Sequence, residues 1–207
     1  MPRLDSVGKA VVASLLLLLA IRLLSLAIVP LTDPTEARYG DIARRMAERS
    51  DWVTPWFTDT LPFWGKPPLS FWASAAGYRT LGGDELALRL PHFCLGIATL
   101  VLVWFEGRRT SVRTAWHATA LLGGSMLFIV GSGAVMTDMA LGFAATLVMI
   151  GMARAATPLA RTGRSATLVA SGITVGLLAK GPVALALLAA ACVVWLLMTR
   201  SDQRDWP

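Results

Sequence analysis

Long apolar runs constrain the fold of this chain more than any other feature of its sequence. A helix needs roughly 20 residues to cross the hydrocarbon core of a bilayer, and a spanning segment must satisfy its own backbone hydrogen bonds. We therefore predict an all-α, polytopic membrane protein with about six transmembrane helices. The predicted spans are residues 10–29, 87–105, 115–130, 139–156, 165–179 and 182–198.

The composition excludes several other classes of protein. Of the 207 residues, 55% are hydrophobic and 15% are charged, whereas soluble domains carry about 25% charged residues. A disordered chain is excluded by the high hydrophobicity, and a soluble globular enzyme is not expected. Cys94 and Cys192 both lie in apolar runs, so we expect no disulfide framework.

The first apolar run is similar to a secretory signal peptide, because Arg3 and Lys9 precede it. However, the run is long enough to span a bilayer, and no small-residue cleavage site follows it. The sequence continues instead as Pro30-Leu31-Thr32-Asp33. We therefore predict that residues 10–29 form an uncleaved first transmembrane helix.

The net charge of +6 is unevenly distributed along the chain. With a cytoplasmic N-terminus, the segments on the cytoplasmic side hold ten of the nineteen Lys and Arg residues, as the positive-inside rule requires. The excess of positive charge therefore indicates topology, and we expect no nucleic-acid partner. The ten residues are Arg3, Lys9, Arg108, Arg109, Arg113, Arg154, Arg161, Arg164, Arg200 and Arg204.

The segment 31–86 forms a long loop on the opposite, periplasmic side, and its composition predicts two juxtamembrane helices. The first follows Asp33, which suits an N-cap, and Pro34, which suits the first helical position. The second begins at Pro67-Pro68 and ends near Gly82-Gly83.

Two patterns in this loop predict that it lies on the membrane surface. One face of the first helix is apolar, which is typical of an interfacial amphipathic helix. Four tryptophans follow, and tryptophan favours the boundary between membrane and water. The apolar face comprises Tyr39, Ile42, Ala43 and Met46, and the tryptophans are Trp52, Trp56, Trp64 and Trp72.

The same topology places several polar residues, distant in sequence, at the periplasmic face. A carboxylate there could deprotonate an attacking hydroxyl, and Lys or Arg could hold a phosphate group and stabilise it as it leaves. A reaction on a phosphorylated lipid is one hypothesis for this cluster. Its members are Asp33, Glu36, Arg38, Tyr39, Lys66, Asp138 and Lys180.

Each of these residues also has a structural interpretation. Asp33 and Glu36 could form only a capping box, and Asp138 and Lys180 could only complement the dipoles of their helices. Arg22 lies inside the first span, where it needs a partner or must reach the interface. His92 and His117 have no metal-ligand spacing between them, so we interpret both as structural.

Four sequence motifs carry a resemblance to a known family. They are Asp33–Met46, Asp51–Pro55, Gly65–Pro68 and Glu85–Pro91, and they are accompanied by Asp138 and Lys180-Gly181. Together they resemble bacterial polyprenyl-phosphate-dependent glycosyltransferases of the GT-C fold. These are relatives of the protein O-mannosyltransferases and of the lipid A 4-amino-4-deoxy-L-arabinose transferase. The resemblance covers essentially the whole chain.

The resemblance implies an inverting glycosyltransferase in the bacterial inner membrane, with its active site on the periplasmic side. The donor would be an undecaprenyl-phosphate-linked sugar, and the acceptor a lipid, a glycan or a protein. The catalytic carboxylates would be Asp33 or Glu36, together with Asp138. The residues near the donor phosphate would be Arg38, Tyr39 and Lys66, with Lys180 of the Lys-Gly pair.

Two departures from the family pattern qualify this expectation. Thr35 stands where the aminoarabinose transferases have Asp, and Trp64-Gly65-Lys66-Pro67 stands where the family often has Phe-Glu-Lys-Pro. Because the Glu is absent, we expect no metal ion, and we expect no cofactor.

Family members usually have about twice as many helices and a C-terminal soluble part, so the chain resembles an N-terminal half. A non-catalytic membrane module is an alternative, either as a binder of polyprenyl phosphate or as a subunit of a larger assembly. A transporter is a further alternative, but the charges gather at one face and no inverted repeat is visible.

Overall fold

The computed structural model describes residues 6–156 and 162–202, and within these ranges the fold is helical. An isolated bridge between Trp56 and Pro62 is the only extended pairing in the described residues. The all-α prediction is therefore confirmed. The helices are α1 (Ser6–Ile28), α2 (Pro34–Arg49), α3 (Leu69–Leu81), α4 (Glu85–Gly107), α5 (Val112–Gly123), α6 (Met126–Gly131), α7 (Asp138–Ala155), α8 (Thr162–Lys180) and α9 (Pro182–Asp202).

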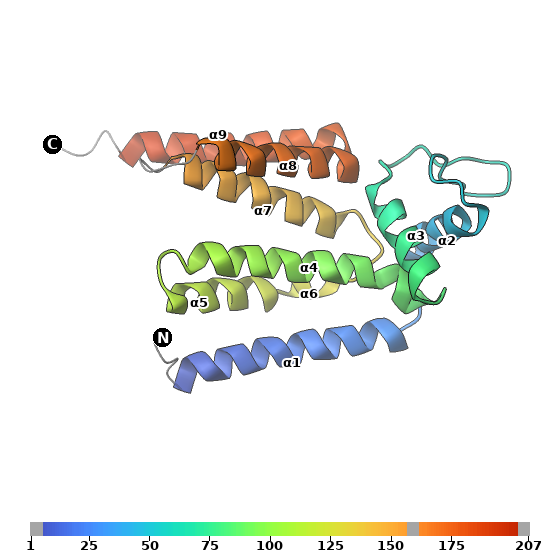
Figure 1. The fold of residues 1–207 in the computed structure, drawn as a ribbon, viewed down its shortest axis with the longest axis horizontal. Helices are drawn as coiled ribbons and strands as arrows, with labels where there is room; N and C mark the ends of the chain where they lie inside the picture. The colour runs from blue at the N-terminus through green and yellow to red at the C-terminus, as the bar shows by residue number, and fades with distance from the viewer. Residues whose placement is uncertain (1–5, 157–161, 203–207) are drawn as a thin grey trace.

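The long helices run side by side and form an elongated bundle, while α2 and α3 gather at one end of it (Figure 1). The beginning of α1 and the connection between α4 and α5 lie at the opposite end (Figure 1). Within the described residues, three helices are long and apolar enough to cross a membrane, namely α1 over Gly8–Ile28, α4 and α7. The count of six spans stays a prediction.

The third predicted span is interrupted in the structure. Residues 115–130 were expected to form one helix, but α5 ends at Gly123 and α6 begins at Met126. Ser125 takes an extended conformation and its hydroxyl accepts the backbone N–H of Phe128 at 3.3 Å. A serine in this role ends one helix and caps the next, so the chain bends here.

The two helices of the long loop form as predicted, but one interpretation of them is wrong. The apolar face of α2 was expected to lie in the membrane surface, whereas its four residues are between 0% and 6% exposed. They pack against Phe71 and Ala75 of α3 and Leu88 of α4. Because α3 covers this face, α2 belongs to a small core at the end of the bundle. The four residues are Tyr39, Ile42, Ala43 and Met46.

The opposite face of α2 carries arginines that fix the loop following the helix. Arg45 Nη1 lies 2.7 Å from Asp59 Oδ1, and Arg49 also pairs with Asp59. Arg44 pairs with Asp41 and with Glu48 on α2 itself. Each of these arginines therefore pairs with at least one carboxylate, while part of each side chain stays exposed.

Candidate active site

A cavity of about 740 Å³ opens in the bundle next to the start of α2 and α7. Its walls come mainly from α6, α7, α9 and the segment between α1 and α2, and most of the lining side chains are apolar. Charged residues concentrate at one part of this lining. They are Arg22, Asp33, Glu36, Arg89 and Asp138.

Asp33 lies at the cavity as the N-cap of α2. Its Oδ1 accepts the backbone N–H groups of Thr35 at 2.8 Å and Glu36 at 3.0 Å. Pro34 occupies the first turn, where its missing N–H costs no hydrogen bond. The predicted cap is confirmed, and the residue remains exposed.

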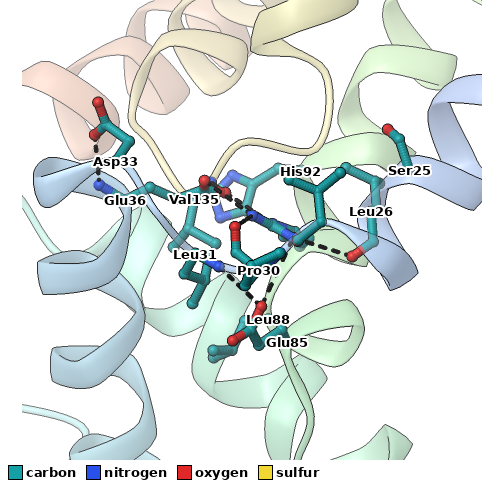
Figure 2. Close-up of polar contacts among 12 residues, drawn as sticks. Ser25, Leu26, Pro30, Leu31, Asp33, Glu36, Glu85, Leu88, His92 and Val135 are labelled. Atoms are coloured by element: carbon teal, nitrogen blue, oxygen red, sulfur yellow. Dashed lines mark hydrogen bonds and ion pairs between the residues drawn. The ribbon is translucent and has the colours of Figure 1, made fainter.

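Glu36 is buried and forms an ion pair with Arg89 of α4 (Figure 2). Arg89 Nε donates to Glu36 Oε1 at 2.9 Å, and Nη2 donates to Oε2 at 3.1 Å. Glu36 Oε1 also accepts the backbone N–H of Val135 at 3.1 Å. The carboxylate is therefore engaged by three donors and takes no part in a capping box with Asp33.

Arg89 connects the end of α1 to α4. Besides Glu36, its guanidinium donates to the carbonyls of Leu26 at 3.1 Å and Pro30 at 3.3 Å, and also to that of Val29 (Figure 2). These contacts satisfy a charge that is 4% exposed, which is the condition for burying one. The site residue Arg89 was missed as a candidate. Its signal was a basic residue within a predicted apolar helix.

Arg22 of α1 is the second arginine that the functional prediction left out. Its Nε donates to the carbonyl of Ser132 at 2.8 Å, and its Nη2 donates to that of Val130 at 2.9 Å. Nη1 contacts Ser25 Oγ at 3.3 Å. Arg22 thus finds its partners in the chain that leaves α6, which agrees with the interpretation that it is structural.

Asp138 and Lys180, which are 42 residues apart in sequence, form an ion pair at the start of α7 and the end of α8. Lys180 Nζ lies 2.6 Å from Asp138 Oδ1. The Asp138 side chain is 59% exposed and the Lys180 side chain is 23% exposed. The structure therefore brings these two candidates together at the edge of the cavity.

The remaining candidates, Arg38, Tyr39 and Lys66, do not line the cavity. Tyr39 is buried between Phe63 and Phe71, and burial raises the pKa of its phenol, with the charge of Asp138 adding to the effect. Arg38 is exposed, with its guanidinium 5.7 Å from the centre of the Phe57 ring.

Lys66 is exposed on the loop before α3. The next residue, Pro67, lies against Gly181, which directly follows Lys180: a Cβ placed on Gly181 would be 3.5 Å from Pro67 Cγ. The Lys66 and Lys180 segments are therefore neighbours.

His92 is fully buried in α4, three residues after Arg89. Its Nε2 is 2.8 Å from Ser74 Oγ, while Nδ1 is buried without a hydrogen-bond partner. Within the described residues, no group of three or more His, Cys, Asp or Glu side chains could hold a metal ion.

A helical bundle with membrane-spanning helices, a largely apolar cavity and charged residues at one end defines a polytopic membrane protein with a site at one face. The sequence profile of the dolichyl-phosphate-mannose-protein mannosyltransferases matches residues 9–207, and the chain belongs to this family. The resemblance to GT-C glycosyltransferases is thus confirmed.

Individual relatives agree with this assignment. The undecaprenyl phosphate-alpha-4-amino-4-deoxy-L-arabinose arabinosyl transferase of Erwinia tasmaniensis is 28% identical over 182 residues, which cover 86% of this chain and 33% of the relative. The crystal structure of ArnT from Cupriavidus metallidurans in the apo state covers 98% of this chain at 27% identity, with a TM-score of 0.80. The same protein bound to undecaprenyl phosphate covers 95% at 28% identity, with a TM-score of 0.81.

The chain spans about a third of the length of these relatives, and 37% of each of the two solved chains. The matched region includes every charged residue that lines the cavity.

Proposed function

We propose that this chain provides the donor site of a membrane glycosyltransferase that moves a sugar from undecaprenyl phosphate to an acceptor hydroxyl. The observation that carries the proposal is the cavity, in which Asp33 and Asp138 stand beside a long apolar wall. A polyprenyl-phosphate sugar has the same two parts, a charged head and an apolar chain. The relatives named for an undecaprenyl phosphate donor support this choice.

The proposed reaction inverts the anomeric carbon. The acceptor hydroxyl oxygen attacks that carbon, the bond from the carbon to the phosphate oxygen breaks, and undecaprenyl phosphate leaves with both bonding electrons. The hydroxyl proton passes to a carboxylate. Asp33 and Asp138 are exposed at the cavity and can accept it, as general base catalysis requires a carboxylate within hydrogen-bond reach.

Glu36 was predicted as a further catalytic acid, and its contacts favour a different role. Both of its oxygens are bound by Arg89, and one of them also binds the N–H of Val135. We assign it to holding the site together.

The donor phosphate would be held by cations around the ion pair. Arg38 is exposed on α2 and Lys66 is exposed on the loop before α3; α2 and α3 gather at the same end of the bundle (Figure 1), and Lys180 lies next to the Lys66 segment. Positive charges placed where a phosphate gains charge on leaving lower the barrier to its departure. The phenol of Tyr39 can donate one hydrogen bond to the same group.

We place the protein in the bacterial inner membrane, with the N-terminus in the cytoplasm and the cavity facing the periplasm. The clusters of basic residues in alternate connections support this orientation. The acceptor would be lipid A, another glycan or a protein.

Transfer of radiolabelled sugar from undecaprenyl phosphate, assayed in membranes that contain the intact protein, tests the proposal. We expect Asp138→Asn and Asp33→Asn each to lower the rate by about a hundredfold or more, as for loss of a general base. Lys66→Met should raise KM for the donor, whereas Arg79→Met should change neither kcat nor KM.

Full activity in both the Asp138→Asn and Asp33→Asn variants would show that the catalytic assignment is wrong. Binding of undecaprenyl phosphate that depends on Lys66 and Arg38, without any transfer of sugar, would favour the non-catalytic module instead.

A further inference from the structure

We propose that Arg22, together with the Glu36–Arg89 pair, positions Asp138 by clamping the chain between α6 and α7. The proposal names positioning residues for the site described above. Its predicted effect on sugar transfer rests on the proposed function. Its predicted effect on the position of Asp138 does not depend on that function.

The first clamp holds the end of α6. The last carbonyls of a helix have no partner within the helix, and they form the negative end of its dipole. Arg22 donates to the carbonyls of Val130 and Ser132 at this end, so a cation from α1 satisfies groups that would otherwise lack hydrogen bonds. An arginine inside an apolar helix needs such partners.

The second clamp holds the chain three residues further on. Glu36 Oε1 accepts the N–H of Val135, and Arg89 fixes the Glu36 carboxylate with two hydrogen bonds. Arg89 is in turn held by carbonyls at the end of α1, including that of Leu26. Val135 is 1% exposed, so this contact is shielded from water.

Between the clamps, the chain lies directly on α1. Gly133 has φ of +89°, a conformation that glycine adopts without steric cost. A Cβ at this position would lie 2.6 Å from Leu26 Cδ1, so a larger residue would push the chain away from α1.

The clamps determine where Asp138 lies, because only two residues separate it from Val135. The Asp138 side chain is more than half exposed, and its carboxylate pairs with Lys180. Its own packing is therefore weak, and its position depends on the backbone that delivers it. A shift of about 1 Å at a reacting group can lower a rate by about a hundredfold.

The Asp138–Lys180 contact provides a direct measure of this position in the intact protein. A carbodiimide joins a carboxylate to an amine that touches it, and this is the one ion pair with a lysine in the described part of the chain. The yield of the isopeptide between Asp138 and Lys180, measured by mass spectrometry on treated membranes, reports whether the two side chains meet.

We expect Arg22→Met to lower the isopeptide yield at least fivefold and Arg22→Lys to restore part of it, since an ammonium can bind one carbonyl but does not have the fork of a guanidinium. Arg79→Met, which removes an exposed arginine of α3, is the matched control and should leave the yield unchanged. In the transfer assay, Arg22→Met should lower kcat by about ten- to a hundredfold and change KM for the donor by less than about twofold.

An unchanged isopeptide yield in Arg22→Met overturns the proposal. If that variant does not accumulate in membranes, the isopeptide yield is measured in Glu36→Gln instead. An unchanged yield in Glu36→Gln also overturns the proposal. If the unsubstituted protein transfers no sugar, the proposed function fails, and the isopeptide yields still decide whether the clamps position Asp138.

Discussion

At the scale of single residues, the charged side chains around the cavity fall into two groups. The first group makes hydrogen bonds to fixed partners within the protein and consists of Glu36, Arg89 and Arg22. Asp33, Asp138 and Lys66 are exposed and keep capacity for a ligand. A charge whose hydrogen bonds are already made stabilises a site, whereas an exposed one can react or bind. The number of hydrogen bonds already made within the protein therefore distinguishes structural from reactive charges better than residue type does.

Asp51 allows a pH prediction at the same scale. Hydrogen bonds from the backbone N–H of Thr54 and from Trp56 Nε1 hold the pKa of its carboxyl below the usual value. A depressed folded-state pKa stabilises the fold above the unfolded pKa of about 3.9, and this contribution is lost as the pH falls through the folded value.

We therefore expect the loop at Asp51 to loosen only below about pH 4. Hydrogen-exchange protection of the Val53 and Thr54 amides, compared between pH 7 and pH 3, measures this. In Asp51→Asn, protection should be lower at pH 7 and should not change further with pH. A loop that loosens equally in both proteins would contradict the assignment.

The residue contacts show what the sequence could and could not predict. The N-cap at Asp33 follows from neighbouring residues, so it was predicted. The pairing of Glu36 with Arg89 spans 53 residues and the contact of Glu36 with Val135 spans 99, and both depend on how α2 turns toward α4. No pattern of neighbouring residues in the sequence predicts the orientation of α2 relative to α4. The expectation that α2 lies on the membrane failed for the same reason, because an apolar face does not reveal what covers it.

At the scale of elements, α7 packs closely on α8. A Cβ on Gly172 would lie 2.7 Å from the carbonyl oxygen of Ala144, and one on Gly151 would lie 2.9 Å from that of Ser165. Contacts this short with backbone leave no room for a methyl group. Small residues such as Gly172 allow this close approach of two membrane helices.

This packing predicts a contrast between two glycine substitutions. We expect Gly172→Ala to destabilise the protein by about 1–3 kcal/mol, since overpacking forces the backbones apart. Gly142→Ala is the matched control, because no atom lies within 4 Å of a Cβ there, and alanine favours a helix by about 1 kcal/mol over glycine.

Thermal unfolding of the two purified variants in the same detergent measures the contrast. The melting temperature should fall for Gly172→Ala and stay level or rise for Gly142→Ala. Equal shifts in both would mean that the helix interface is not as close as the structure places it.

At the scale of the whole molecule, the arrangement of the helices agrees with the charge distribution. The connection that holds Arg108 and Arg109 lies at the end of the bundle opposite α2 and α3 (Figure 1). The candidate active site is at the other end. Apolar runs and loop charges predict this layout because both depend on the membrane, whereas the break between α5 and α6 depends on a cap within one apolar run.

The proposed orientation predicts which positions a membrane-impermeant thiol reagent can reach. With Cys94 and Cys192 replaced by serine, Thr58→Cys should be labelled in intact spheroplasts. Arg109→Cys should be labelled only after the membrane is opened, because the proposed orientation places this position on the cytoplasmic side. Labelling of both positions in intact spheroplasts would contradict the orientation.

The contacts of Arg22 have a consequence for the order in which the protein is made. Its carbonyl partners lie 108 and 110 residues further along the chain. When α1 first enters the bilayer, those residues have not yet been synthesised, so the guanidinium must reach toward the interface along its flexible stem. Only when the chain emerges past Ser132 can the charge exchange water for carbonyls. The final position of the first helix in the membrane thereby depends, through Arg22, on the synthesis of the segment that precedes Asp138.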